Sequence, residues 1–304
     1  MSESELPPFQ PQVESEKSAT KIGKFRASQM LVSESWTILK HDKEIMWFPV
    51  LSTIASLVVI AIMGILFYIF FIFVMESNID AFMDSEESVL LFDLLPVLLF
   101  VSYTVLAYIV NFFQAGMFVI IHGRMNGSDL TFNDGIAGAQ QVAGKIFLWS
   151  VISATLGVIL DFISDRSKLV GNAVAALFGA TWNTLTYFSL PALVISKTSV
   201  IGAFKMSAET IRNTWGETII ITIGTAFFFN LIVVAGMALG FFIMILIPNM
   251  ASTFYILLLT SFIAVGIVTP SLEAVFKLAL FEYARTGVIP KGFSQELIEN
   301  AIKT

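Results

Sequence analysis

Six long apolar runs constrain this chain more than any other feature of its sequence. They cover residues 48–75, 91–121, 146–163, 170–195, 219–247 and 254–280. A helix needs about 20 apolar residues, at a rise of roughly 1.5 Å each, to cross a bilayer, and each run approaches or exceeds that length. The composition agrees, because 56% of the residues are hydrophobic and only 13% are charged. The sequence therefore predicts an all-α fold, a polytopic membrane bundle of six transmembrane helices.

The basic residues predict the orientation of these spans. Of the 17 lysines and arginines, 15 fall at one end of the six runs, and only Arg166 and Lys168 fall at the other. The segment 76–87, on the side of Arg166, carries five acidic residues and no basic one. Basic residues stay in the cytoplasm, so we expect a multi-pass protein of the cytoplasmic (inner) membrane with both termini cytoplasmic.

Three regions of the chain differ in composition. Residues 1–21 are rich in proline and glutamate and have too little apolar surface to fold, so they are predicted to be a disordered tail. Residues 22–287 form the six-span membrane domain. Residues 288–304 are expected to be a short cytoplasmic tail.

Two similar charged phrases lie between the runs, FRASQMLVSESW from Phe25 and FKMSAETIRNTW from Phe204. Each has an aromatic residue, a basic residue, any residue and serine, with tryptophan eleven positions after the aromatic. The second phrase continues a stripe that begins at Val200 and passes through Ala208 and Ile211, which predicts an amphipathic helix. Such an elbow helix lies in the membrane interface; packing against the bundle explains the same stripe equally well.

Interfacial residues follow from this reading. Trp47 and Trp149 are expected to join the elbow tryptophans in an aromatic belt. Residues predicted to meet lipid headgroups or the interface are Arg26, Trp36, His122, Arg124, Lys205, Arg212 and Trp215.

A fainter elbow is predicted after Arg124. Thr131 and Asp134 have the spacing of a capping box, and Phe132, Ile136, Ala139 and Ala143 give a thin apolar face. With it, the chain divides into three parallel units, each an elbow helix followed by an outward and a returning span. Inverted repeats, common among transporters, are not visible.

Three stretches together resemble a known family. They are SESWTILKHDKEIMWFPVLS, LFGATWNTLTYFSLPALVI and FEYARTGVIPKGFSQELIENA, the last being the most specific. They resemble a widespread prokaryotic family of uncharacterised six-span membrane proteins, over about residues 25–301. The elbow phrases are also distantly similar to the membrane domain of glycerophosphodiester phosphodiesterases. The resemblance implies a fold and a bacterial or archaeal cytoplasmic membrane, and it implies no reaction.

Polar residues inside spans are the usual markers of function in membrane proteins. Those singled out are Asn111, Asn183, Asn230, Glu273 and Lys277. The asparagines fall nearest mid-depth, where hydrogen bonds between helices explain them more simply than a solute site. Glu273 and Lys277 are spaced for an ion pair one helical turn apart.

Proline and glycine mark positions where spans kink or break. They are Pro96, Pro191, Gly236, Gly240 and Pro270. Kinks and close helix contacts are favoured over discontinuous helices, because both residues are common in membrane helices. Pro270 has no N–H, so backbone carbonyls near Ile267 lose a hydrogen-bond donor. The hydroxyls of Thr269 and Ser271 are expected to reach nearby backbone and compensate for this loss.

Catalytic and metal-binding patterns are missing from the sequence. There is no cysteine and there are only two histidines, which excludes disulfides and thiolate chemistry and argues against a histidine-rich metal site. His122 is the best isolated acid–base candidate, though a solvated loop residue is the simpler interpretation, and with Arg124 it suits a lipid phosphate. We expect no catalytic residue, metal, cofactor or nucleic-acid partner.

The sequence leaves three functions open. The first is a non-enzymatic inner-membrane protein that binds membrane lipids, a membrane protein partner or a second copy of itself. The second is a small-solute transporter or channel, which the asparagines and helix breaks permit. The third is a membrane-embedded enzyme of lipid metabolism, which requires a cluster of acids or histidines.

Overall fold

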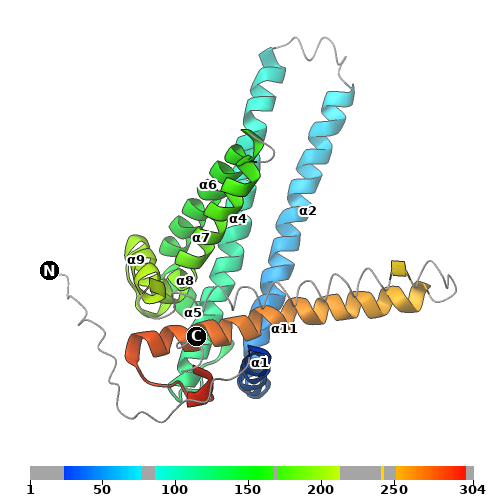
Figure 1. Cartoon of the computed structure of the whole chain (residues 1–304). Coiled ribbons are helices and arrows are strands. Elements are labelled where there is room, and N and C mark those ends of the chain that lie inside the picture. Colours follow the sequence, from blue (N-terminus) through cyan, green and yellow to red (C-terminus); the bar gives the residue numbers. More distant parts are fainter. Residues whose placement is uncertain (1–23, 77–85, 167–169, 213–240, 243–250, 299–304) are drawn as a thin grey trace.

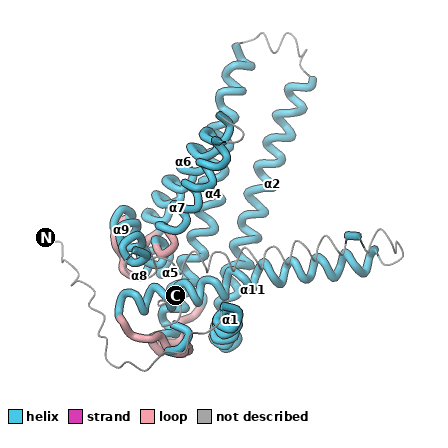
Figure 2. Tube along the Cα trace, viewed as in Figure 1, coloured by secondary structure: helices cyan, strands magenta, loops and turns pink. Residues whose placement is uncertain are grey.

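The computed structural model describes residues 24–76, 86–166, 170–212, 241–242 and 251–298, and among these there is no strand (Figure 2). The helices in chain order are α1 (Lys24–His41), the 3-10 helix η1 (Lys43–Met46), α2 (Trp47–Glu76), α4 (Glu86–Met125), α5 (Phe132–Gln141), α6 (Ala143–Arg166), α7 (Val170–Leu185), α8 (Ser189–Ile195), α9 (Val200–Thr210) and α11 (Ala251–Thr286). The all-α prediction is confirmed for this part of the chain.

Four long helices rise from a common base. Figure 1 shows α2, α4, α6 and α7 extending upward, while α1, α5, α8, α9 and the C-terminal end of α11 gather below them. Three segments of the described residues are long and apolar enough to cross a membrane, Lys43–Ile72, Pro96–Met125 and Ala143–Leu160. These match the first three predicted spans.

The surface of α2 requires an apolar environment. None of the 18-residue apolar window of this helix is buried by the protein itself. Its exposed side chains include Ile54, Leu57, Val58, Ile62, Ile65, Phe67 and Phe71. A continuous apolar surface of this size is not stable in water. The protein is therefore a membrane protein.

The fourth predicted span, 170–195, is broken. α7 ends at Leu185 and α8 begins at Ser189, so the run contains a break just before Pro191 instead of a kink at it. Pro191 is the third residue of α8, where its ring clashes with the carbonyl of Tyr187 in any helix that continues upstream. The Phe188 N–H at the break donates to Ser207 Oγ of α9 at 2.9 Å. The elbow helix α9 thus provides a hydrogen-bond acceptor for a backbone N–H at the break.

The other two prolines that were predicted to mark kinks leave their helices continuous. Pro96 lies inside α4 and Pro270 inside α11. Pro270 has no N–H for the carbonyl of Gly266, four residues earlier. Ser271 Oγ makes the predicted contact with nearby backbone by donating to Ile267 O at 2.9 Å, the carbonyl next to that of Gly266. Gly236, Gly240 and the fifth run, 219–247, lie outside the described residues apart from Phe241 and Phe242.

The elbow helices form and pack against the base. In α5, the Thr131 hydroxyl and the Asp134 carboxylate make the predicted capping box. The buried residues of α9 and its C-terminal cap are Val200, Ala203, Ser207 and Ile211. The buried face therefore has Ala203 and Ser207 where the predicted stripe has the next residues, Phe204 and Ala208.

Trp149 is not part of an exposed belt. Its ring stacks on Trp182 of α7 at 6.0 Å between centroids, and Trp182 stacks on Phe204 of α9 at 5.5 Å. Trp149 is only 7% exposed, because the aromatic column joins α6, α7 and α9. The packing interpretation of the α9 stripe therefore has direct support, while Trp215 lies outside the described residues.

The sixth predicted span lies within α11, but this helix runs across the base of α2 and α4 instead of alongside them (Figure 1). Its direction is set by its C-terminal half, where Ala274, Val275, Leu278 and Phe281 are all buried. The base core that surrounds them also contains Leu39, Ile45, Phe48, Phe118, Ile121, Phe188, Leu193 and Leu297.

Residues 288–298, which were expected to be a tail, pack onto α1. Phe293, Leu297 and Ile298 are buried, and the Ser294 N–H donates to Glu34 Oε2 at 3.0 Å. Gly292 has φ +94° and lies against Ile38, so a glycine is needed at this turn. The segment therefore belongs to the folded base.

Candidate functional site

Six charged or titratable residues meet where α4 ends, and we call this cluster the polar base. It consists of Asp42, His122, Arg124, Asp129, Glu282 and Arg285. The members come from the α1–η1 junction, the end of α4, the loop after it and the end of α11. Positions far apart in the sequence thus supply opposite charges to one place.

Arg124 is held by two carboxylates. Its guanidinium forms ion pairs with Asp42 and with Asp129. Asp42 is 3% exposed and also caps η1 by accepting from the Glu44 N–H, whereas Asp129 is 85% exposed. A buried carboxylate needs a paired cation and further hydrogen bonds. Arg124, predicted to meet a lipid phosphate, therefore already has a structural partner inside the protein.

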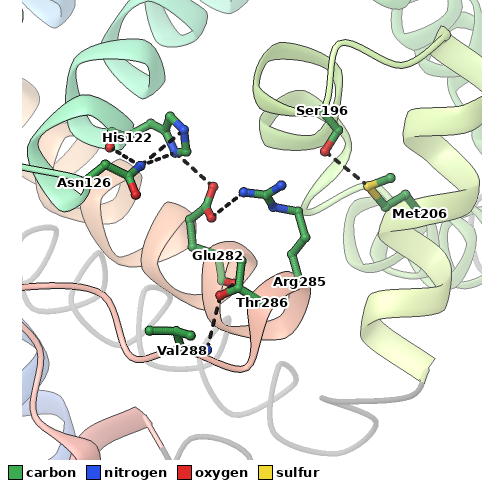
Figure 3. Close-up of polar contacts among 8 residues, drawn as sticks. All are labelled: His122, Asn126, Ser196, Met206, Glu282, Arg285, Thr286 and Val288. Atoms are coloured by element: carbon green, nitrogen blue, oxygen red, sulfur yellow. Dashed lines mark hydrogen bonds and ion pairs between the residues drawn. The ribbon is translucent and has the colours of Figure 1, made fainter. Parts of the chain in front are cut away.

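His122 lies within α4, and not in a solvated loop. Its Nδ1 is 3.0 Å from Glu282 Oε1, and Arg285 Nη2 is 2.8 Å from Glu282 Oε2 (Figure 3). The contact of His122 Nδ1 with Glu282 Oε1 is an ion pair when the ring is protonated, and Asn126 Nδ2 lies 3.3 Å from Nε2 of the ring. Glu282 therefore joins α11 to α4 through one shared carboxylate.

The environment of Glu282 favours its charged form. Burial by itself raises the pKa of this carboxyl, but hydrogen bonds from His122 and Arg285 outweigh burial, so the pKa falls below its ordinary value of 4.5. A carboxylate with a depressed pKa in the folded state stabilises the protein above its ordinary pKa. That contribution is lost as the pH falls through the folded-state pKa.

We therefore expect the stability difference between the wild type and Glu282→Gln to depend on pH. The difference in thermal unfolding temperature in detergent should be full at neutral pH and should shrink below about pH 4.5. Glu209→Gln, on the exposed face of α9, is the matched control and should show little difference at either pH. A Glu282→Gln difference that stays constant from neutral to acidic pH would contradict this expectation.

A second contact region lies beside the polar base, between the start of α2 and α5. The Glu44 carboxylate accepts from the Phe132 N–H at the start of α5. The ring of Phe48 packs against Phe132 at 4.6 Å between centroids. A Cβ at Gly135 would lie 2.6 Å from Phe48 Cζ, so only glycine allows the phenyl ring to enter. Phe48 is a wedge that fixes the start of α2 to α5.

The predicted pair of Glu273 and Lys277 forms. Lys277 Nζ is 3.3 Å from Glu273 Oε1 and also lies 4.5 Å from the centroid of the Tyr187 ring. Lys277 is 13% exposed and Glu273 is 50% exposed. The ammonium therefore connects α11 to the break between α7 and α8.

The remaining predicted residues are separated from one another. Asn111 Nδ2 of α4 donates to Ser150 Oγ of α6 at 3.1 Å, which is a hydrogen bond between helices. Asn183 is exposed on α7, and Asn230 lies outside the described residues. Arg26 is in α1, while Lys205 and Arg212 are exposed on or just after α9, and Trp36 is 43% exposed on α1.

Several residues that make contacts between helices carry no signal for those contacts in the sequence, namely Asp42, Glu44, Ser207 and Glu282. Arg285 pairs with Glu282 within α11. Glu282 and Arg285 stand three apart at the end of a helix, a spacing that predicts a local ion pair. Nothing in one sequence links Glu282 to His122 or Ser207 to Phe188.

The long apolar helices and a base closed by paired charges define this molecule as a helical multi-span membrane protein. The chain belongs to DUF6159, a family of unknown function whose pattern matches residues 92–291. That match includes α4, the polar base of α11 and the turn after it. No curated protein and no solved structure matches the chain, so the likeness of the elbow phrases to glycerophosphodiester phosphodiesterases has no match to support it.

Proposed function

We propose that this chain is a non-enzymatic protein of the cytoplasmic membrane whose base binds lipid or a membrane partner at the cytoplasmic leaflet. The proposal rests on the separation of apolar and charged side chains between two parts of the protein. Exposed apolar side chains cover α2, whereas the charged groups of the polar base neutralise one another below it. Paired charges hold helices together, and a charged end below an apolar shaft fits a membrane interface.

The same proposal extends to the whole chain. We infer six spans arranged as three units, in which α1, α5 and α9 are the elbows. The order α1–α2–α4 and α5–α6–α7 supports two of these units, and α9 precedes the runs 219–247 and 254–280. Lys205 and Arg212, exposed on the outer side of α9, are suitably placed for anionic headgroups.

Reporter fusions test the orientation. A reporter that is active only in the cytoplasm should be active after Thr304 and inactive within residues 77–87. A reporter that requires export should give the opposite pattern. Cytoplasmic activity within 77–87, or export-dependent activity after Thr304, would overturn the topology.

A transporter is the second candidate, because discontinuous helices line the pathways of many transporters. The break between α7 and α8, with Lys277 beside Tyr187, is the observation that favours it. Solute flux in proteoliposomes that Glu273→Gln abolishes, while the protein keeps its thermal unfolding temperature, would place this candidate first. If no solute flux depends on Glu273, the lipid-binding proposal stays first.

A further inference from the structure

The base of α2 carries a shallow groove. Its volume is about 310 Å³, and it is lined by Glu44, Trp47, Leu51 and Phe132. Glu44, Trp47 and Leu51 follow at spacings of three and four, so they form one stripe, and Phe132 of α5 supplies the other wall. The groove lies at the end of a segment that is long enough to span a membrane, Lys43–Ile72.

The groove combines a fixed carboxylate with an exposed indole. One oxygen of Glu44, Oε2, accepts from the Phe132 N–H, which holds the side chain against the groove wall. Within the described part of the chain, the other oxygen, Oε1, has no hydrogen-bond partner. Trp47 is 57% exposed although it begins a membrane helix. Both groups are therefore available to a ligand.

These groups favour one kind of ligand. A carboxylate attracts an ammonium and accepts its hydrogen bonds, and an indole face attracts a cation through its quadrupole. Leu51 and Phe132 offer apolar surface for the first carbons of an acyl chain. The exposed Lys43, next to Glu44 in the chain, provides a cation for a phosphate. An acidic groove of this kind disfavours purely anionic headgroups.

We propose that this groove binds the headgroup of an ethanolamine phospholipid, with its ammonium on Glu44 and Trp47. The inference rests on the proposed function, because it requires the base of α2 to lie at the leaflet surface. It adds a specific chemistry to that function: the protein distinguishes an amine-bearing lipid from an anionic one.

Short-chain lipids test the site in purified, detergent-solubilised full-length protein. The probes are dihexanoyl phosphatidylethanolamine, dihexanoyl phosphatidylglycerol and soluble glycerophosphoethanolamine, and the readout is saturable binding by native mass spectrometry. The ethanolamine lipid should bind the wild type more tightly than the other two probes. Glu44→Gln should weaken its binding about tenfold, because one charge-assisted hydrogen bond is lost. Trp47→Leu should weaken it about fivefold, because the cation–π contact is removed.

The variants are chosen so that they fold. A glutamine at position 44 retains a carbonyl oxygen that accepts from the Phe132 N–H, and leucine at position 47 keeps apolar surface. Trp36→Leu, which changes another exposed tryptophan of the base, is the matched control and should leave ethanolamine binding unchanged. Thermal unfolding of each variant without lipid checks its integrity.

Three outcomes would overturn the inference. Phosphatidylglycerol binding as tight as phosphatidylethanolamine would show that the site does not select the amine. Equal binding of glycerophosphoethanolamine would identify a soluble amine as the ligand. Unchanged ethanolamine binding in Glu44→Gln would place the lipid elsewhere. In each case the protein still binds a lipid or another ligand, whereas a protein that binds none of the probes contradicts the lipid-binding part of the proposed function as well.

Discussion

Replacing Arg124 by alanine should destabilise the protein by about 3–5 kcal/mol, the cost of leaving a buried carboxylate without its partner. The stranded group is Asp42, which is only 3% exposed to solvent. Equilibrium unfolding in mixed micelles measures the loss. Because Asp42 is the N-cap of η1, the junction between α1 and α2 should also become more accessible to proteases.

Two further variants separate this cause from a general loss of charge. Asp129→Asn removes the other, 85% exposed partner of Arg124 and should cost less than about 1 kcal/mol. The double variant Arg124→Ala/Asp42→Asn should recover most of the stability, because asparagine still caps η1 and carries no charge. A double variant as unstable as Arg124→Ala alone would contradict the buried-charge explanation.

Phe48→Ala should produce the second large effect, a loss of about 3 kcal/mol in the same unfolding measurement. Its ring is fully buried between Gly135 and Phe132, so alanine leaves a cavity at the contact of α2 with α5. The matched control is Phe67→Ala on the same helix, whose ring is 52% exposed and should matter little. Equal losses for the two variants would show that Phe48 does not act as a wedge.

Local patterns in the sequence predicted local structure well. The limits of the first three spans agree with α2, α4 and α6 to within a few residues, because an apolar run of that length is stable only as a membrane helix. The capping box of Thr131 and Asp134 and the pair of Glu273 and Lys277 also form. The capping box and the ion pair each depend on residues within one turn of a helix.

Contacts between distant segments could not be predicted in this way. His122 directly follows the second apolar run, and its partner Glu282 comes 160 positions later in another motif. The direction of α11 and the burial of Trp149 likewise depend on which helices pack together. Apolar periodicity identifies the buried face of a helix without identifying the helix that covers it.

The hydrogen bond between Glu34 and Ser294 has a consequence for the biosynthesis of the chain. Its two groups are 260 residues apart, so the N-terminal elbow is inserted long before its partner leaves the ribosome. The break before α8 is completed much sooner, since Ser207 follows Phe188 by only 19 residues. The region of α8 and α9 is therefore completed earlier in synthesis, whereas the contact of α1 with Ser294 forms only when the last segment arrives. A chain interrupted before residue 294 would retain its membrane helices but would lack the hydrogen bond that Ser294 makes to Glu34 of α1. Incomplete molecules therefore differ from complete ones at the surface of α1.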